Sequence, residues 1–394
     1  MESVAIVGGC GHVGLPLALC LADAGLPTVS FDIDADTVSI VNAGSMPFLE
    51  SGAPPVLERV LANGSFRATT DASVIADVDA IIVVIGTPVD EHMNPNPNAV
   101  VNAISDCIPY MHSGQLVMLR STLFPGVSRR VEVLLNDSGL ECDVVFCPER
   151  IVEGHAMTEL HELPQIIGAR TPTGSTRARA IFSFLGVECV DVTPEEAELA
   201  KLFTNSWRYI KFAAANQFWM MANEAGLDFA PIRDAIMFEY PRAADLPGPG
   251  FAAGPCLFKD TMQLAAFMNN NYLLGHSAMM VNEGQPMYIA DRIEMSHDLS
   301  GSVVGILGMA FKAESDDTRE SLSYKLKRVM QFRAKDVLTT DPFVTTDPNL
   351  LTLDEVVARS DILIIGAPHS VYRGLVTDKP VIDIWNLRGE GTLV

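Results

Sequence analysis

Residues 4–14 read VAIVGGCGHVG, and this stretch decides the fold at the start of the chain. Four apolar residues typical of a buried strand lead into a match to the pattern GxGxxG, which opens a helical segment. We expect Gly9 to permit a tight turn, Gly11 to let a pyrophosphate approach the backbone, and Gly14 to allow close helix–strand packing. The same ligand is expected to contact the variable positions of the motif, His12 and Val13.

A carboxylate at the end of the next predicted strand supports a dinucleotide site. Asp32 lies 18 positions after Gly14 (32 − 14), where it can bind a ribose 2′-hydroxyl and repel a 2′-phosphate. This arrangement favours NAD over NADP. Open α/β sheets place their ligands at the carboxyl ends of strands, and further polar residues stand there: Thr87, Ser121 and Thr122. The alternative is a glycine turn in an α/β domain that binds no ligand.

Short apolar runs alternate with helical patterns at both ends of the chain, which predicts parallel sheets with helices on both faces. The first half has predicted strands Val4–Gly8, Thr28–Asp32, Ala80–Ile85, Leu116–Leu119 and Val144–Cys147, and predicted helices Val13–Ala24 and Val100–Ile108. One more helix and strand are expected within Pro172–Val192. A second unit has predicted strands Val303–Leu307, Asp336–Thr340, Ile362–Gly366 and Val381–Ile384.

The middle of the chain is predicted to be helical. Pro194-Glu195-Glu196 is a good helix start, and neither glycine nor proline follows until Gly226. Such a helix would span about 45 Å. A Pro/Gly-rich stretch, residues 246–255, precedes further helices over Gln263–Met268 and Ala278–Ile293. We therefore predict an α/β fold in which two Rossmann-like doubly wound domains, 1–193 and 299–394, are joined by a helical central domain, 194–298, with a long spine helix.

Composition limits the class of protein and its partners. The 394 residues are 48% hydrophobic, yet they include no run of about 18 apolar residues and no pattern of a secretory signal. Seven cysteines without CxxC or zinc-like spacing predict reduced thiols in the cytoplasm and no metal site. A net charge of −22 argues against nucleic acid and membrane surfaces as partners. An anionic ligand would need local cations to overcome this charge.

Cys256 has chemically suggestive neighbours. It follows the glycine-rich stretch and precedes Lys259 and Asp260, so Cys256 and Asp260 share one face if a helix begins here. A helix N-terminus and a nearby lysine favour the thiolate, which can add to an aldehyde. Taken alone, a cysteine near a helix start is more often a packing residue.

Two further polar groups are candidates for a site. The segment Glu149-Arg-Ile-Val-Glu-Gly154 follows a predicted strand and is expected near the nicotinamide end of a cofactor. Lys201, Asn205 and Arg208 share one stripe of the long helix by three/four spacing, whereas Lys211 lies on another face. A solvated face is the alternative, but the apolar residues around this stripe favour a buried polar cluster.

Six motifs in order and spacing resemble those of the UDP-glucose/GDP-mannose dehydrogenase family, over nearly the whole chain. They are Gly9–Gly14, Ser121-Thr-Leu-Phe-Pro-Gly126, Cys147-Pro-Glu-Arg150, Lys201-Leu-Phe-Thr-Asn205, Cys256-Leu-Phe-Lys-Asp260, and Gly308-Met-Ala-Phe-Lys312 with Asp316-Asp-Thr-Arg319. The resemblance implies a four-electron oxidation that uses two NAD. The C6 alcohol of a UDP-sugar becomes an aldehyde, Cys256 traps it as a thiohemiacetal, and a thioester then yields the uronate.

The resemblance also implies roles at the matching positions. Lys201 and Asn205 would stabilise oxyanions, and Asp260 would orient a water or relay a proton. Supporting roles around that water are implied for Thr122 and Glu149, with Glu153 as a further candidate base. Substrate contacts are implied for Glu149, Arg150, Ile151, Lys201, Asn205, Lys211, Arg242, Gly250, Phe251, Lys312 and Arg388, and a cofactor contact for Arg319.

The chain departs from the family pattern in the loop before Cys256, which usually reads Gly-x-Gly-Gly-x-Cys. Here it is Gly250-Phe-Ala-Ala-Gly-Pro-Cys256, one residue longer, and alanine in place of glycine narrows the backbone options. The Cys147–Arg150 run resembles members acting on UDP-N-acetylhexosamines, whereas Cys256–Asp260 resembles UDP-glucose members. We predict an N-acetylated substrate, because residues 149–154 should line the sugar pocket, with UDP-glucose as the alternative. Family members are commonly dimers through the central helix, so we expect a homodimer.

Two other classes of protein remain open. A two-electron β-hydroxyacid dehydrogenase shares the N-terminal fold and a lysine on the long helix, but it has no cysteine nucleophile and no second α/β domain. A non-catalytic NAD-binding protein would turn over no UDP-sugar. The presence of Lys201, Asn205, Cys256 and Asp260 argues against the second class.

Overall fold

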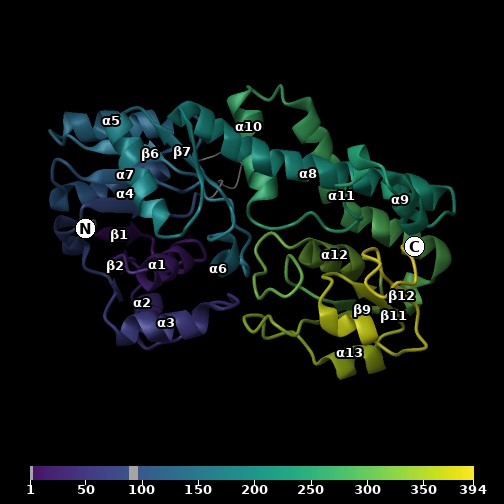
Figure 1. The fold of residues 1–394 in the computed structure, drawn as a ribbon. Coiled ribbons are helices and arrows are strands. Elements are labelled where there is room, and N and C mark those ends of the chain that lie inside the picture. Colours follow the sequence, from purple (N-terminus) through teal and green to yellow (C-terminus); the bar gives the residue numbers. More distant parts are fainter. Residues whose placement is uncertain (1–2, 88–95) are drawn as a thin grey trace. The chain divides into compact units, whose positions relative to one another are not determined.

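The computed structural model describes residues 3–87 and 96–394 and divides into two compact units, Met1–Thr204 and Asn205–Val394 (Figure 1). The long helix α8, Pro194–Glu224, gives its first residues to unit 1 and its remainder to unit 2. Contacts thus group the helical middle of the chain with the second α/β unit. The three domain limits 1–193, 194–298 and 299–394 stay a prediction.

Unit 1 is built on one eight-stranded sheet in the order β3-β2-β1-β4-β5-β6-β7-β8. Its first six strands follow the order 3-2-1-4-5-6 of the dinucleotide-binding fold, and their pairs are all parallel. The strands are β1 (Val4–Val7), β2 (Thr28–Phe31), β3 (Phe66–Thr69), β4 (Ala80–Val83), β5 (Leu116–Leu119), β6 (Asp143–Phe146), β7 (Gln165–Ala169) and β8 (Cys189–Val192).

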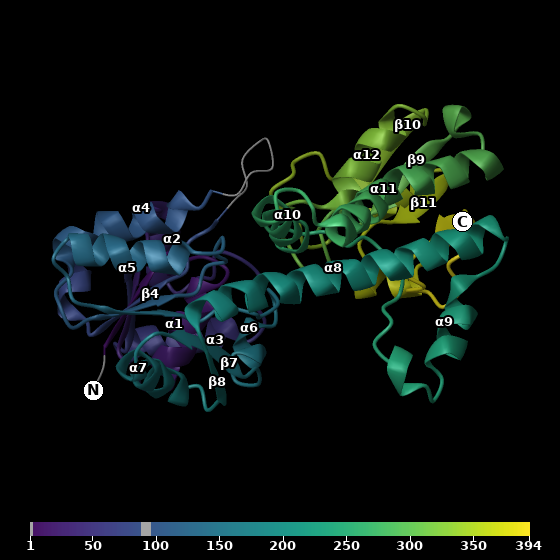
Figure 2. The same ribbon diagram turned by 90° about the horizontal axis from the view of Figure 1, so that it is seen from above.

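Helices cover both faces of this sheet. Strand β1 alternates between two apolar clusters, with Val4 and Ile6 in one and Ala5 and Val7 in the other. The first cluster packs α1, α3 and α7, and the second packs α4 and α5 on the opposite face (Figure 2). The helices are α1 (Gly14–Asp23), α2 (Ala35–Asn42), α3 (Ala53–Ala62), α4 (Asn98–Cys107), α5 (Val127–Asp137), α6 (Ala156–Glu159) and α7 (Pro172–Ser183), with 3-10 turns η1 (Ala72–Asp77) and η2 (Ile108–Tyr110).

The predicted strands of unit 1 are confirmed to within two residues at their ends, and Leu116–Leu119 matches without change. Two strands were not predicted, β3 and β7. Strand β7 runs antiparallel to β6, so the sheet is mixed rather than wholly parallel. A five-residue strand that gains its partners from β6 and β8 carries little signal of its own, because its pairing depends on distant residues.

Helix α8 confirms the predicted spine helix. The Thr193 hydroxyl accepts from the Glu196 amide at 3.3 Å, and the Glu196 carboxylate accepts from the Thr193 amide at 2.8 Å, which is a capping box. Pro194 then occupies the first helical position. The 31 residues span about 45 Å at 1.5 Å per residue. No helix among the described residues is both long and apolar enough to cross a membrane.

Unit 2 carries a four-stranded parallel sheet in the order β10-β9-β11-β12. One face packs on α8, α11 and α12 through Trp219, Ile289 and Leu326, and the other packs on α13 through Val356. Its elements are α9 (Phe229–Met237), α10 (Leu257–Phe267), α11 (Leu273–Ser296), β9 (Val303–Leu307), α12 (Leu322–Gln331), β10 (Asp336–Thr340), α13 (Leu353–Arg359), β11 (Ile362–Ile365) and β12 (Val381–Ile382), with η3 (Pro241–Ala243), η4 (Leu299–Gly301) and η5 (Ser370–Gly374).

Several element ends in unit 2 differ from the prediction. Helix α11 covers Leu273–Ser296 rather than Ala278–Ile293, helix α10 ends at Phe267 rather than Met268, and strand β11 ends at Ile365 rather than Gly366. Strand β12 stops at Ile382 rather than Ile384, because the Asp383 carboxylate turns the chain by accepting from the amides of Trp385 and Arg388 at 3.2 and 2.9 Å. Helix α10 begins at Leu257, six residues before the predicted start at Gln263 (263 − 257). This earlier start puts Cys256 at the N-cap.

Candidate functional site

The glycine loop after β1 is shaped for a dinucleotide, with one change from the expected roles. The left-handed residue of the turn is Gly8, with φ 76°, and not Gly9. Gly9 is required for a different reason, the close approach of β2. A Cβ on Gly9 would be 2.6 Å from the Ser30 hydroxyl oxygen. A Cβ on Gly14 would be 2.5 Å from the Gly8 carbonyl oxygen, which confirms the close packing of α1.

Gly11 is the open position of the loop. A Cβ on Gly11 would have the Gly8 oxygen as its nearest neighbour, at 3.8 Å, so a phosphate can approach the backbone there. Among the described residues, no side chain caps the start of α1, where Val13 is the N-cap. The first amides of α1 therefore keep their capacity to bind an anion. His12 stacks on Phe48 at 4.0 Å between ring centroids.

Asp32 lies beside this loop as predicted. Its carboxylate accepts from the amides of Cys10 at 3.0 Å and Asp34 at 3.2 Å, which fixes it at the end of β2. Each hydrogen bond uses a different carboxylate oxygen, and such an oxygen can accept more than one hydrogen bond. The Asp32 carboxylate can therefore still accept hydrogen bonds from ribose hydroxyls. Thr87 follows β4, the neighbour of β1 in the sheet, and Ser121 and Thr122 follow β5, the strand beyond β4. The residues present thus fit NAD.

Glu149 follows β6 and is held by Arg120, a residue that the sequence did not single out. The buried Arg120 guanidinium pairs with one Glu149 oxygen and donates to Gln165 at 3.1 Å. The other Glu149 oxygen accepts from the amides of Arg150 and Ile151 at 2.7 and 3.1 Å. Burial raises the pKa of Glu149, but the charge and hydrogen bond of Arg120 lower it more, and the net shift is downward. This carboxylate is therefore a fixed anion and a weak base.

The rest of the 149–156 loop is also held by carboxylates. Glu50 is buried and accepts from the amides of Gly154 and Ala156, both at 2.8 Å. Glu159 accepts from the Val152 amide at 2.6 Å. Glu153 lies half-buried within this loop. The loop predicted to line the sugar pocket is thus ordered by acids whose partners are backbone amides.

The predicted polar stripe on α8 is largely buried. Lys201 is 8% exposed and Asn205 5% exposed, whereas Arg208 is half-buried. No described residue forms a hydrogen bond or ion pair with Lys201. A buried ammonium without a carboxylate partner is costly unless a ligand or transition state supplies the charge. The predicted role of Lys201 in stabilising negative charge stays a prediction, and this burial fits it.

Cys256, Asn205 and Asp260 come together in unit 2. Cys256 is the N-cap of α10, and its carbonyl oxygen accepts from the Asp260 amide at 2.9 Å. The Asp260 side chain is fully buried and its Oδ2 accepts from the Asn205 amide group at 2.6 Å. The other oxygen, Oδ1, lies 3.6 Å from the Lys259 ammonium and accepts no hydrogen bond from the described residues.

Cys256 differs from the other six cysteines by its exposure, since those are buried or half-buried. Burial is also the main cause of raised thiol pKa values elsewhere. It raises the pKa of Cys10, Cys20 and Cys147 to about 12, and that of Cys107 to about 11. Burial also raises the pKa of Cys142 and Cys189, so the thiolate is disfavoured at all six of these positions, and Cys256 stays the predicted nucleophile.

The lengthened loop before Cys256 has positive φ values only at its glycines. Gly250 has φ 147° and Gly254 has φ 99°, whereas the two alanines between them keep ordinary negative φ values. A Cβ on Gly250 would overlap the Trp385 ring. Asn216 clamps the loop by bonding both the Gly250 amide at 2.9 Å and its carbonyl at 3.0 Å. The alanines therefore impose no backbone conflict, and the loop is ordered.

The predicted substrate cations of unit 2 are mostly engaged with acids or rings. Lys211 pairs with Asp245 at 3.0 Å, Arg319 with Asp317 at 2.6 Å and Arg388 with Glu390 at 2.9 Å. Lys312 lies over Phe311, and Arg242 donates to the Tyr240 hydroxyl at 3.2 Å. Phe251 is buried with its ring edge-on to Trp385. Whether these cations bind a nucleotide stays a prediction.

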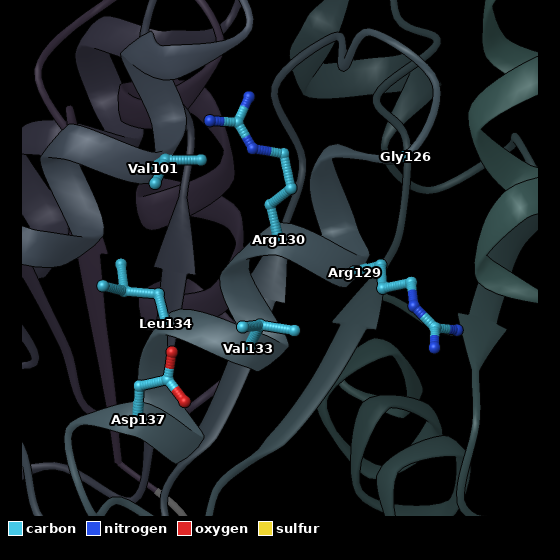
Figure 3. A pocket seen from close by; sticks show the side chains of 7 residues that line it. All are labelled: Val101, Gly126, Arg129, Arg130, Val133, Leu134 and Asp137. Carbon is cyan, nitrogen blue, oxygen red and sulfur yellow. The ribbon is translucent and has the colours of Figure 1, made fainter.

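A groove of about 480 Å³ on the surface of unit 1 contains none of the predicted site residues (Figure 3). It lies over α4 and α5, and Arg130 at its edge donates to Asn98 at 2.7 Å. The residues that line it are Val101, Gly126, Arg129, Arg130, Val133, Leu134 and Asp137. The chemistry of the candidate site lies elsewhere, at the strand ends and at α10.

A dinucleotide-binding sheet, a spine helix with a buried lysine and a second parallel α/β sheet define a dehydrogenase of nucleotide-linked substrates. Comparison with known families agrees. Residues 2–185 match the NAD binding domain of the UDP-glucose/GDP-mannose dehydrogenase family, residues 195–284 its central domain and residues 305–389 its UDP binding domain. The chain belongs to this family, which confirms the predicted family and the NAD cofactor.

Individual relatives cover nearly the whole chain. An NDP-N-acetyl-D-galactosaminuronic acid dehydrogenase of Ralstonia solanacearum is 29% identical over 95% of this chain and 92% of its own. A UDP-N-acetyl-D-mannosamine dehydrogenase of Yersinia pestis is 28% identical over 95% of both. The solved structure of a UDP-glucose dehydrogenase from Pyrobaculum islandicum has a TM-score of 0.90 at 25% identity, over 97% of this chain and 94% of its own.

Proposed function

We propose that this enzyme oxidises the C6 alcohol of a UDP-N-acetylhexosamine to the carboxylate in two steps, with Cys256 as covalent nucleophile. The observation that carries the proposal is the group at the start of α10. An exposed cysteine occupies the N-cap, and one turn later a fully buried carboxylate is hydrogen-bonded to Asn205 of the spine helix. A packing cysteine would need neither the exposure nor the polar group behind it.

The N-cap position supports a nucleophilic role for Cys256. A thiolate there faces the unpaired amides and the positive end of the α10 dipole, both of which favour the anion. The Cys256 sulfur would add to the carbonyl carbon of the intermediate aldehyde and form a C–S bond, with a proton going to the new oxyanion. Loss of a hydride from the carbon and of a proton from the hydroxyl of this thiohemiacetal gives a thioester. Water then cleaves the C–S bond and releases the carboxylate and the thiol.

The cofactor and the polar residues have separate roles in the two oxidations and in the hydrolysis. NAD, held by Gly9–Gly14 and Asp32, would supply the acceptor for two electron pairs, one at each oxidation. Lys201 and Asn205 would stabilise negative charge on the substrate oxygen, where one aimed donor contributes about 3 kcal/mol. Asp260 would orient the hydrolytic water through Oδ1, the oxygen that accepts no hydrogen bond from the described residues.

One finding favours an N-acetylated sugar. The relatives similar over nearly the whole chain include enzymes named for such sugars. UDP-glucose is the alternative, supported by the structural similarity to a UDP-glucose dehydrogenase. A panel of UDP-N-acetylhexosamines, UDP-glucose and GDP-mannose, monitored by NADH absorbance, would separate them. Turnover of UDP-glucose alone would contradict the proposal.

The test of the covalent role compares Cys256→Ser with Cys142→Ser, a half-buried cysteine of unit 1. We expect the wild type and the Cys142 variant to form two NADH per uronate. The Cys256 variant should bind NAD with unchanged affinity but form no uronate, because a serine hydroxyl is a far weaker nucleophile. Four-electron turnover by Cys256→Ser would refute the covalent role, and one NADH per sugar in the wild type would indicate a two-electron enzyme.

We also propose a homodimer that forms through α8. An apolar stripe on this helix lies open to solvent, with Trp207 58% and Met221 59% exposed and Phe218 between them. Aromatic stripes of this kind on a monomer usually mark an interface. Sedimentation equilibrium should show a dimer for the wild type and for Phe332→Glu, an exposed aromatic residue away from α8, and a monomer for Trp207→Glu. A Trp207→Glu dimer would contradict this interface.

We propose the cytoplasm as the location of the enzyme. Its seven cysteines are free thiols, which the reducing conditions of the cytoplasm maintain.

A further inference from the structure

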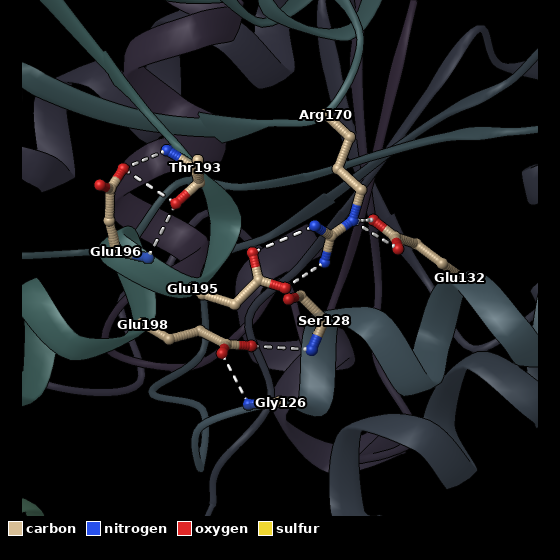
Figure 4. Close-up of polar contacts among 8 residues, drawn as sticks. All are labelled: Gly126, Ser128, Glu132, Arg170, Thr193, Glu195, Glu196 and Glu198. Carbon is tan, nitrogen blue, oxygen red and sulfur yellow. Dashed lines mark hydrogen bonds and ion pairs between the residues drawn. The ribbon is translucent and has the colours of Figure 1, made fainter.

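A buried glutamate on α8 links the spine helix to the loop that follows β5. Glu198 is completely buried, and its two oxygens accept from different amides of unit 1. Oε2 accepts from the Gly126 amide at 2.7 Å and Oε1 from the Ser128 amide at 2.8 Å (Figure 4). Since Gly126 is the N-cap of α5 and has no side chain to cap it, Glu198 serves as the cap from another helix.

The loop held in this way carries a predicted site residue. Residues 121–126 connect β5 to α5, and Thr122 lies in this short segment. One end of the segment is fixed because the amides of Arg120 and Ser121 continue the ladder to the Val83 carbonyl, at 2.9 and 3.3 Å. The other end is fixed by Glu198 at Gly126. Glu198 is therefore one of the supports of the segment that carries Thr122, together with Leu123, which is buried in the core.

Glu198 also lies one turn before Lys201 on α8. Residues three apart share one face of a helix, so the carboxylate fixes the face from which the Lys201 ammonium projects. Lys201 itself has no bonding partner among the described residues, so it does not hold this turn in place. We propose that Glu198 is a positioning residue, which holds the Thr122 loop and Lys201 in the positions that the reaction requires. The proposal rests on the function proposed above for these two residues.

A second contact between the same helices supplies the control. Arg170 bonds Glu195 of α8 at 2.5 Å and Glu132 of α5 at 2.7 Å, both on the solvent side (Figure 4). This clamp joins α5 to α8 as Glu198 does, but it touches neither the 121–126 loop nor the turn before Lys201. A general weakening of the α5–α8 contact would follow from loss of either glutamate. Displacement of the 121–126 loop and of Lys201 should follow only from loss of Glu198.

The experiment compares Glu198→Gln with Glu195→Gln in the full chain. The glutamine keeps the shape of Glu198, but its NH₂ group cannot accept from one of the two amides. We expect kcat for UDP-sugar oxidation to fall about 10- to 100-fold in Glu198→Gln, the range for a misplacement near 1 Å. KM should change little, and Glu195→Gln should match the wild type. Each kcat is expressed per NAD-binding site, and these sites are counted by calorimetry, so that misfolded protein does not lower the value.

Hydrogen–deuterium exchange provides a readout that needs no turnover. Amides in the peptide covering residues 121–128 should exchange faster in Glu198→Gln and not in Glu195→Gln. Glu198→Asp keeps the charge with a shorter reach and should recover part of kcat. Equal exchange in both glutamine variants, or an unchanged kcat in Glu198→Gln, would overturn the positioning role. A wild type without UDP-sugar turnover would instead refute the proposed function, while the exchange rates would still test the hold on the loop.

Discussion

Replacing Asp341 by alanine should destabilise unit 2 strongly. Asp341 follows β10, and its side chain is fully buried beside His369, which donates through Nε2 at 3.0 Å. The imidazole must carry its proton on Nε2, because Nδ1 accepts from the Glu314 amide at 2.9 Å. The carboxylate accepts from four further donors, the amides of Met309, Ala310, Phe343 and Val344, at 2.6, 2.9, 2.9 and 3.1 Å.

The magnitude follows from the donors that the substitution leaves without an acceptor. Met309, Ala310 and His369 are each at most 1% exposed, and an unsatisfied buried donor costs about 1–3 kcal/mol. Water can enter the space left by the carboxylate and satisfy part of this demand. We therefore expect Asp341→Ala to lower the free energy of unfolding of unit 2 by about 3–6 kcal/mol, a large part of the ~5–15 kcal/mol of a typical domain.

The tryptophans make unit 2 separately observable. All three, Trp207, Trp219 and Trp385, lie in unit 2, so fluorescence excited at the red edge reports this unit alone. Urea titrations followed by fluorescence should show an early transition in Asp341→Ala, while circular dichroism also detects unit 1. Asp336→Asn is the control, since this exposed carboxylate at the other end of β10 accepts only from its neighbouring amide at 2.8 Å. It should change stability by less than about 0.5 kcal/mol.

A small effect would refute this reasoning. If Asp341→Ala unfolds within about 1 kcal/mol of the wild type, the carboxylate does not hold the loops after β9 and β10. The same conclusion would follow if Asp336→Asn were equally destabilising, because burial would then not decide the cost.

Three further predictions concern the same two units. Burial raises the pKa of Asp341, but its hydrogen bonds lower it more, so its contribution is complete above the ordinary carboxyl pKa of about 3.9 and is lost as the pH falls below it. The urea midpoint of unit 2 should therefore drop as the pH falls below about 4 in the wild type, and drop less in Asp341→Ala. Gly250→Ala should destabilise the same fluorescence transition, because φ 147° and the Trp385 ring exclude a Cβ, whereas Gly248→Ala, with no atom within 4 Å, should not. Asp32→Ala should improve NADP relative to NAD in steady-state kinetics, and an unchanged ratio would contradict the ribose role of this carboxylate.

The sequence predicts the parts of this fold whose signal is local. Buried runs such as Leu116–Leu119 and Val303–Leu307 are apolar throughout because both faces of a doubly wound sheet are covered, and their bounds agree with the structure. Helix α8 is equally readable from its start signal and the absence of breakers. Strands β3 and β7 were not predicted, because their pairing is set by neighbours distant in sequence.

The candidate site divides in the same way. Cys256, Asp260 and the glycine loop are predictable because their chemistry requires particular residue types at particular spacings. Arg120, Glu50 and Glu198 are not, since each acts through backbone amides or a partner that only the tertiary fold brings near. Arg120 did leave one signal, a charged residue directly after the apolar run of β5. A charge at the end of a buried strand predicts an internal partner.

The ion pairs of unit 2 bear on how so acidic a chain could bind an anionic nucleotide. Lys211 and Arg388 pair with Asp245 and Glu390, whose side chains are exposed, and solvent screens such pairs so that they contribute little to stability. A diphosphate with two or more charges can therefore replace these acids at small cost. Arg319 differs, because its partner Asp317 is buried and also accepts from the Arg319 amide at 2.8 Å, so exchange there would take the guanidinium away from a buried carboxylate. It follows that Lys211 and Arg388 are better candidates for phosphate contacts than Arg319.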